Sequence, residues 1–269
     1  NHNITGVRYG SADWGDYNND GYLDVVLSGI TVNGTYTTRV FRSEKNGVFT
    51  DTGEIFGTRG IVKWGDYDND GDLDILIISS DQNRVYRNDG NDTFTFQNQI
   101  SLESAMYGNG AWGDYDNDGY LDIVVSGYIG MYIPFSKIYR NNKDNTFHED
   151  TSCVITQAGS SVPSWGDFDN DNDLDLLFVG VSSDSAFVKL YRNDIGTANS
   201  VPEKPIGLVS NVSKSEVELR WNSVRSDSTN YHGLTYNLII GSSLDDFDLV
   251  TPHSSPQGYR RLVKMGNAG

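Results

Sequence analysis

The chain has 269 residues, of which 37% are hydrophobic and 12% aromatic, and it carries a net charge of −17. This composition is typical of a globular chain with one large or two ordinary domains and excludes a disordered one. No apolar run is long enough to cross a bilayer, so no membrane insertion is expected in this segment. Cys153 is the only cysteine, which excludes an intrachain disulfide and a cysteine metal cluster.

The negative charge is concentrated in four nine-residue segments. Residues 16–24, 66–74, 114–122 and 167–175 hold 17 of the 37 acidic residues. The other 20 acidic residues balance the 20 lysines and arginines, so the rest of the chain is formally neutral. Because no basic patch stands out, nucleic acid is excluded as a partner.

The acidic segments belong to an internal repeat. A tryptophan stands two residues before each segment, and an aromatic residue followed by arginine comes after it. The tryptophans are Trp14, Trp64, Trp112 and Trp165, with spacings of 50, 48 and 53 residues. Each repeat reads as four short strands, the first ending near the tryptophan. The second is an apolar run covered on both faces: 23–27, 73–78, 121–125 and 174–179.

A four-stranded unit that recurs about every 50 residues is typical of a β-propeller blade. The sequence therefore predicts an all-β fold, with blades at about 6–56, 57–100, 101–157 and 158–194 within residues 1–198. The tryptophans are expected to pack between blades. The fourth repeat has no recognisable fourth strand.

A second β unit is expected after the repeats. Residues 199–205 contain two prolines and read as a linker. Within residues 206–269, the segments 217–221 and 234–240 alternate as strands of a sandwich do, and 259–265 is a further candidate strand. This unit is short for a complete sandwich.

Each acidic segment has the pattern of a cation-binding loop. Oxygen-bearing side chains occupy positions one, three, five and nine, and a backbone carbonyl at position seven completes the set. Alternating oxygen ligands suit Ca²⁺, which takes about six to eight of them. Position six is glycine in three loops and Asn172 in the fourth, the next-best residue for a positive φ.

The sequence thus predicts up to four calcium ions, one per blade. The predicted ligands are Asp16, Asn18, Asp20, Tyr22 and Asp24; Asp66, Asp68, Asp70, Asp72 and Asp74; Asp114, Asp116, Asp118, Tyr120 and Asp122; and Asp167, Asp169, Asp171, Asp173 and Asp175. The first loop carries one formal charge fewer, because Asn18 replaces an aspartate, and is expected to bind most weakly. An EF-hand is excluded, since position twelve falls inside a predicted strand.

The pattern Trp-Gly-Asp-(Tyr/Phe)-(Asp/Asn)-Asn-Asp-Gly-(Tyr/Asp)-Leu-Asp, followed by an apolar strand, resembles the FG-GAP/VCBS repeat of integrin-α-like propellers. The resemblance covers residues 1–194. It implies that the calcium loops are structural, that the protein is secreted or at the cell surface, and that these blades belong to a larger propeller, usually seven-bladed. Residues 206–269 resemble the first strands of a fibronectin type III domain.

A ligand is expected on the face opposite the calcium loops. In a four-stranded meander, the second-to-third and the blade-to-blade connections share that face. The aromatic residues placed there are Tyr36, Tyr107, Tyr128, Tyr132, Phe135 and Phe187. They suit an extracellular protein or glycan ligand. The alternative is a long hairpin that packs its own aromatic side chains.

Catalysis finds little support in the sequence. The four histidines lie in dissimilar contexts, and the clustered carboxylates are the predicted metal ligands. The predicted function is therefore a non-catalytic calcium-binding scaffold for adhesion or recognition. Two alternatives remain: a carbohydrate-active module, either a lectin or part of a polysaccharide-degrading enzyme, and a purely structural spacer.

Overall fold

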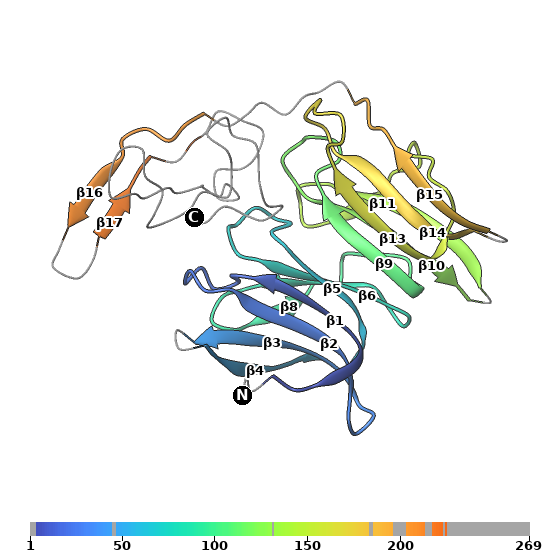
Figure 1. Ribbon diagram of the computed structural model, residues 1–269, viewed down its shortest axis with the longest axis horizontal. Coiled ribbons are helices and arrows are strands. Elements are labelled where there is room, and N and C mark those ends of the chain that lie inside the picture. The colour runs from blue at the N-terminus through green and yellow to red at the C-terminus, as the bar shows by residue number, and fades with distance from the viewer. Residues whose placement is uncertain are drawn as a thin grey trace.

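The fold is all-β, as the sequence predicts. The computed structural model describes residues 4–44, 47–130, 132–182, 185–195, 203–212, 217–222 and 224 (Figure 1). These residues form antiparallel sheets and no helix. In the described part of the chain, no helical segment therefore has the length and hydropathy needed to cross a membrane.

Four sheets account for residues 7–191, and each follows its strands in chain order. Blade 1 comprises β1 (Val7–Gly15), β2 (Asp24–Thr31), β3 (Tyr36–Glu44) and β4 (Val48–Phe56). Blade 2 comprises β5 (Gly60–Gly65), β6 (Asp74–Ser79), β7 (Arg84–Asn88) and β8 (Phe94–Phe96). Blade 3 comprises β9 (Met106–Gly113), β10 (Asp122–Ile129), β11 (Ile133–Asn141) and β12 (Phe147–Glu149). Blade 4 comprises β13 (Gly159–Gly166), β14 (Asp175–Ser182) and β15 (Ser185–Tyr191).

The strands lie where the repeats predict them. Every first strand ends one residue after its tryptophan, and every apolar run after an acidic loop is a second strand. All six residues of β6 are buried, as expected for a strand covered on both faces. Each acidic segment is thus the loop that joins the first strand of a blade to the second.

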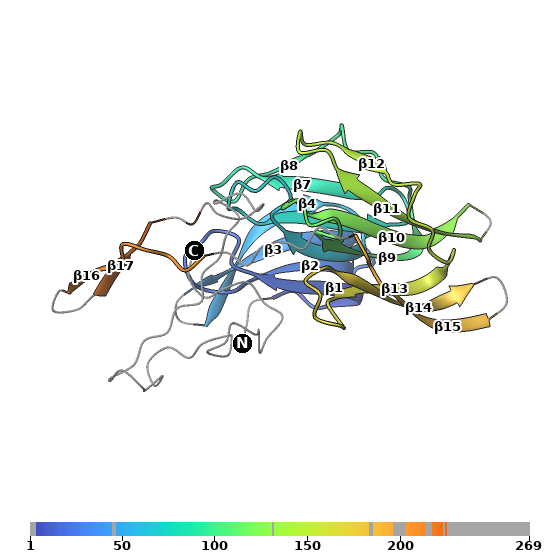
Figure 2. The ribbon, with the colours of Figure 1, turned by 90° about the horizontal axis from the view of Figure 1, so that it is seen from above.

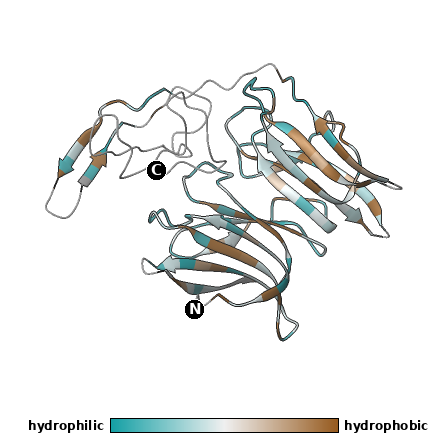
Figure 3. Ribbon diagram, viewed as in Figure 1, coloured by the Kyte–Doolittle hydropathy of each residue, from teal (hydrophilic) through white to brown (hydrophobic). Residues whose placement is uncertain are grey.

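The blades pack face to face in chain order. β1 contacts β5, β5 contacts β9, and β9 contacts β13. Figure 2 shows the sheets of blades 3 and 4, from β9 to β15, side by side. A separate hydrophobic core lies at each junction, between blades 1 and 2, blades 2 and 3, and blades 3 and 4. Hydrophobic residues accordingly lie along the strands (Figure 3). This is the packing of propeller blades.

Three of the four tryptophans pack between blades, as predicted, whereas Trp14 is 58% exposed. Trp64 stacks on Tyr17 of the preceding blade, with ring centroids 5.7 Å apart and planes 2° from parallel. Trp112 stacks in the same way on Tyr67, and Trp165 on Tyr115. The glycines after the first three tryptophans, Gly15, Gly65 and Gly113, make room for the next tryptophan. A Cβ on Gly65 would lie 2.6 Å from Trp112, closer than carbon atoms approach.

Beyond the blades, β16 (Val209–Val212) and β17 (Val217–Arg220) form a two-stranded sheet. The strand predicted at 217–221 is therefore present. The strands predicted at 234–240 and 259–265 lie outside the described residues. The resemblance to a fibronectin type III domain and the domain boundaries stay predictions.

Candidate metal centres

The first aspartate of each loop holds the turn in shape. Asp66 accepts hydrogen bonds from the backbone N–H groups of Asp70 and Gly71, each at 3.1 Å. Asp16, Asp114 and Asp167 accept the equivalent pairs in the other loops. Position six has a positive φ in every loop, including 70° at Asn172. The turn therefore survives the replacement of glycine by asparagine.

The last aspartate of each loop is buried and ties the second strand to its own loop and to the end of the third strand. Asp74 is fully buried, and its two oxygens accept hydrogen bonds from the backbone N–H of Tyr67 at 3.1 Å and of Asn88 at 2.8 Å. Asp24, Asp122 and Asp175 are equally buried and make the same two contacts. The loop is thereby fixed to the end of the third strand.

Positions five and seven lie next to each other. The backbone N–H of Asp72 donates to Asp70 at 2.9 Å, and that of Tyr120 donates to Asp118 at 3.1 Å. Tyr22 and Asp173 donate to Asp20 and Asp171 in the same way. The chain thus curls around the side chain at position five, which brings position seven to the rim of the carboxylate cluster.

The carboxylates converge in three of the four loops. Ligand oxygens from three aspartates lie within 4.8 Å of one another in each of these loops. The groups are Asp66, Asp68 and Asp70; Asp114, Asp116 and Asp122; and Asp167, Asp169 and Asp175. The first loop forms no such group, since Asn18 supplies an amide at position three.

Position three also carries buried oxygens without hydrogen-bond partners. One carboxylate oxygen of Asp68 and one of Asp169 are in this state. A buried acceptor without a donor is costly, and a carboxylate oxygen in that state fits a cation better than a solvated turn. The donor set, made of oxygen atoms alone, matches the preference of Ca²⁺.

Burial raises the pKa values of four carboxyls in the first three loops. Desolvation, reinforced by neighbouring carboxylates, raises the pKa of Asp74 to about 9 and that of Asp122 to about 8. The pKa values of Asp24 and Asp66 rise to about 7 for the same main reason. A divalent cation would favour the charged forms and reverse these shifts.

Basic side chains compensate part of the charge in the last two loops. Arg140 forms ion pairs with Asp116 and, at 3.4 Å, with Asp118. Arg192 contacts Asp169 at 3.1 Å. These arginines follow the aromatic residue in the repeat, but sequence reasoning assigned them no part in the loops.

Sequence reasoning also missed the contacts that join one loop to the next. The side-chain amide of Asn69, at position four, donates to the carbonyl of Gly119 at 2.7 Å. Asn19 and Asn117 make the equivalent bond to Gly71 and Asn172. The sequence does contain a signal for these contacts, because asparagine occupies position four in every loop. The four loops therefore form one continuous acidic rim.

The predicted ligand-face residues divide into two groups. Tyr36, Tyr107 and Tyr132 are exposed, and Tyr128 is half-buried. Phe135 is only 3% exposed and packs in the core, while the partly buried Phe187 packs against Phe178. The structure therefore places Phe135 away from any ligand surface, because the Phe135 ring fills the junction between blades 2 and 3.

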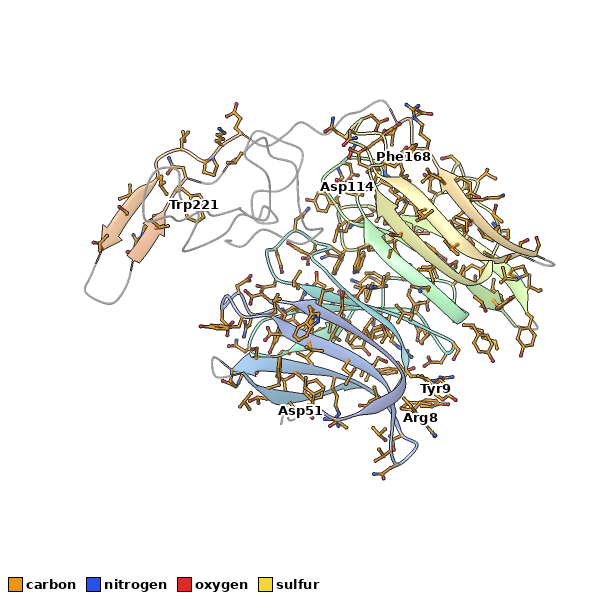
Figure 4. The ribbon with its side chains drawn as sticks, in the orientation of Figure 1. Arg8, Tyr9, Asp51, Asp114, Phe168 and Trp221 are labelled. Carbon is orange, nitrogen blue, oxygen red and sulfur yellow. The ribbon has the colours of Figure 1, made fainter. Side chains whose placement is uncertain are left out.

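Two further residues lie on the ligand face and were not predicted from the sequence: Tyr9 of β1 and Arg59 of the connection between β4 and β5. Tyr9 is 77% exposed near the start of β1. The acidic loops, which contain Asp114 and Phe168, follow the first strands and so lie at the other end of the blades (Figure 4). The guanidinium of Arg59 lies 5.7 Å from the ring centroid of Tyr9 and 5.5 Å from that of Tyr36.

One of the comparisons with known proteins, a match to a repeat family, agrees with the repeat assignment. None of the curated proteins matches the chain. A solved lectin from Agrocybe aegerita, described as specifically recognising non-reducing terminal N-acetylglucosamine, is 20% identical, with a TM-score of 0.45. That similarity covers 68% of this chain and 52% of the lectin, so the chain spans about half of the lectin's length. Residues 16–77 and 66–125 match the FG-GAP-like repeat family, and these two segments are FG-GAP-like repeats.

Proposed function

We propose that the protein is a non-catalytic, calcium-stabilised recognition module of the extracellular space. The observation that carries the proposal is the convergence of carboxylate oxygens in the loops, with partnerless oxygens at Asp68 and Asp169. Four bound ions would offset about half of the negative charge of the 17 acidic residues in the loops and reduce the repulsion between adjacent loops. Millimolar calcium outside cells suits loops of this kind, which supports an extracellular location.

The residues that would hold each ion are those at positions one, three, five, seven and nine. When bound, calcium supplies positive charge and no redox chemistry. Position one keeps the turn closed and position nine fixes the loop to the third strand. We propose no catalytic residue in this assembly.

Calcium titration of the full chain by isothermal calorimetry tests the metal assignment. Up to four ions should bind, and Asn18→Asp should tighten the weakest site by restoring the charge that the other loops have. Asp51→Asn is the matched control, because Asp51 is an acidic residue of β4 outside the loops. No heat of binding at millimolar calcium would contradict the proposal.

The recognition surface is the ligand face on the other side of the blades. Tyr107 and Tyr132 are 63% and 61% exposed, and their rings stack with centroids 6.5 Å apart. Both residues have a positive φ, as has Tyr9. Such backbone strain costs about 1–3 kcal/mol for a residue other than glycine and clusters at functional sites. Exposed aromatic rings held at that cost support binding of a protein or glycan.

The recognition role is tested by screening the chain against a glycan array and extracellular protein ectodomains. The double variant Tyr107→Ala/Tyr132→Ala should lose at least tenfold in affinity for any ligand found. Val32→Ala is the control, since Val32 is an exposed apolar residue of the same face, in the β2–β3 turn, and carries no aromatic ring. A ligand bound equally well by both variants would rule out Tyr107 and Tyr132 as its binding site.

A further inference from the structure

One position of the repeat presents a different side chain in each blade. The residue five positions before the tryptophan is Tyr9, Arg59, Tyr107 or Ser160, whereas the tryptophans and the acidic loops recur. Tyr9, Tyr107 and Ser160 have a positive φ, and each lies where the pairing of the first strand with the second is irregular. A bulge of this kind re-aims a side chain. The scaffold therefore repeats while the side chain presented at this position varies.

The exposure of Tyr9 belongs to this position of the repeat. Its counterpart Tyr107 lies in blade 3, which has a described blade on each side, and is still 63% exposed, against 77% for Tyr9. The packing of a neighbouring blade thus leaves a side chain at this position open to solvent.

Arg8 and Tyr36 lie on the side of blade 1 that packs against blade 2. Ser11 of this side accepts a hydrogen bond from the backbone of β5 at 3.2 Å. Ser11 pairs with Ser28 of β2, and Arg8 pairs with Ile30, two residues further along β2. Residues two apart in a strand share a face. Tyr36 pairs with Ile30 from β3, so Arg8 and Tyr36 flank the junction of two described blades.

Arg59 lies between two tyrosine rings at this junction. Its guanidinium is 5.7 Å from the ring centroid of Tyr9 and 5.5 Å from that of Tyr36, within the range of cation–π attraction. A guanidinium that stacks on ring faces keeps the N–H groups at its edge for other partners. Those groups match the two oxygen atoms of a carboxylate.

No carboxylate of the described residues forms an ion pair with Arg59 or Arg8. The other arginines of the described chain are all paired: Arg39, Arg42, Arg84, Arg87, Arg140, Arg192 and Arg220. Asp81 bonds Thr58, the neighbour of Arg59 in the chain, but its ion pair is with Arg84. The acidic loops lie at the other end of the blades. This part of the ligand face therefore complements an anion.

We propose that the junction of blades 1 and 2 binds an acidic glycan, with the carboxylate of a uronate sugar on Arg59 and the sugar ring against Tyr9. The inference rests on the proposed recognition role of this face and names the chemistry of its ligand. Arg8 supplies a second positive charge for a neighbouring uronate of the same glycan. A glycan is favoured over an acidic peptide, because an extended peptide commonly pairs with a sheet edge. Tyr9, Tyr36 and Arg59 lie instead at strand beginnings and in a connection.

Biolayer interferometry of the full chain against immobilised uronate oligosaccharides tests the proposal. The probes are short oligosaccharides of hyaluronan, alginate and polygalacturonate, each beside its carboxyl-reduced form, which is the same chain without carboxylates. At least one probe should bind, and its carboxyl-reduced form should bind about tenfold more weakly or worse.

Substitution of Arg59 locates the site. Arg59→Gln should weaken binding about tenfold or more. Arg59→Lys should weaken it nearly as much, because lysine keeps the charge but lacks the planar fork of N–H groups. Arg39→Gln removes the same charge from blade 1 and is the matched control, since Arg39 is paired with Asp51 and lies on the opposite side of the sheet. It should bind like the parent chain.

Three results would overturn the proposal. If no uronate probe binds, the site is not one for acidic glycans, and the screen for ligands of Tyr107 and Tyr132 still tests the recognition role separately. If Arg59→Gln and Arg39→Gln lower the affinity alike, the attraction is a general charge effect. If a polyglutamate peptide binds as tightly as the glycans and Arg59→Gln abolishes its binding, the site belongs to an acidic peptide. A melting temperature of Arg59→Gln equal to that of the parent chain excludes unfolding as the cause of lost binding.

Discussion

At the scale of one residue, the asparagine at loop position four has two roles: it adopts a left-handed backbone conformation and it bonds the next loop. Asn69 adopts a left-handed φ of 57°, which asparagine tolerates better than most residues. Its amide is also buried and bonds the next loop. The sequence shows the repeated asparagine, but its partner lies 50 residues away in another blade. That contact follows only from the packing of blades, which local spacing does not contain.

Replacement of Asn69 separates its two roles. Asn69→Gly keeps access to the left-handed conformation and loses the bond to Gly119, so it should cost about 1 kcal/mol of unfolding free energy. Asn69→Ala loses both and should cost about 1 kcal/mol more. Urea unfolding measures the difference. An Asn69→Gly variant as stable as the parent chain would show that the inter-loop bond contributes nothing.

The glycine after each tryptophan gives a second test with an internal control. Gly65→Ala would force a Cβ against Trp112 and should cost about 1–3 kcal/mol. Gly166→Ala introduces the same methyl group where no described atom lies within 4 Å, and should be neutral or slightly stabilising. Thermal unfolding of both variants measures the two stability changes. Equal losses would mean that the glycines serve backbone conformation and not tryptophan packing.

At the scale of the element, the sequence pattern predicts where the strands lie but not which of their faces are buried. Apolar runs after each acidic loop predict the second strands, and β6 is buried throughout as expected. The equivalent strand of blade 4, β14, alternates between buried and exposed residues. Its sequence is as apolar as that of the others, but no described strand covers the face that carries Leu177, Val179 and Val181. Burial on that side depends on a neighbour, which the strand's own sequence does not specify.

The turn between β6 and β7 links blades 1 and 2 through Asp81. Burial pushes the pKa of Asp81 upwards, but hydrogen bonds from Ser79, Thr58 and Arg84 outweigh burial and hold the pKa below its usual range. Thr58 belongs to the connection between β4 and β5, so the carboxylate ties that connection to blade 2.

The lowered pKa of Asp81 predicts an acid-sensitive junction. Its contribution is fully present above the unfolded pKa of about 3.9 and is lost as the pH falls through the lower folded value. Asp81→Asn should therefore cost about 1 kcal/mol at pH 7, since the carboxylate is half exposed, and less at pH 3. Unfolding at both pH values measures this. A loss that is the same at pH 7 and pH 3 would contradict it.

At the scale of the whole molecule, the repeat predicts the fold and the positions of the loops. Four tryptophans and four acidic segments suffice to place every blade, because each repeat carries its own tryptophan, acidic loop and apolar second strand. The ligand face is less predictable. Phe135 and Tyr132 lie three residues apart, yet one fills a junction core and the other reaches solvent. Which ring turns inwards depends on the register of β10 with β11 and on the neighbouring blade.

The central claim is that calcium holds the acidic rim together. Each ion at 100 times its dissociation constant would stabilise the folded chain by about 2.7 kcal/mol. For a domain of this size, that corresponds to a rise in melting temperature of roughly 5–10 °C per site. Magnesium at the same concentration is the control, because it is smaller and prefers to keep its own water ligands.

The most direct measurement is the melting temperature of the full chain in calcium, in magnesium and in excess chelator. The account predicts a melting temperature at least 5 °C higher in calcium than in chelator, with magnesium close to the chelator value. Asp68→Asn, which removes the carboxylate with a partnerless oxygen, should reduce that gain. Identical melting curves in calcium and in chelator would contradict the account.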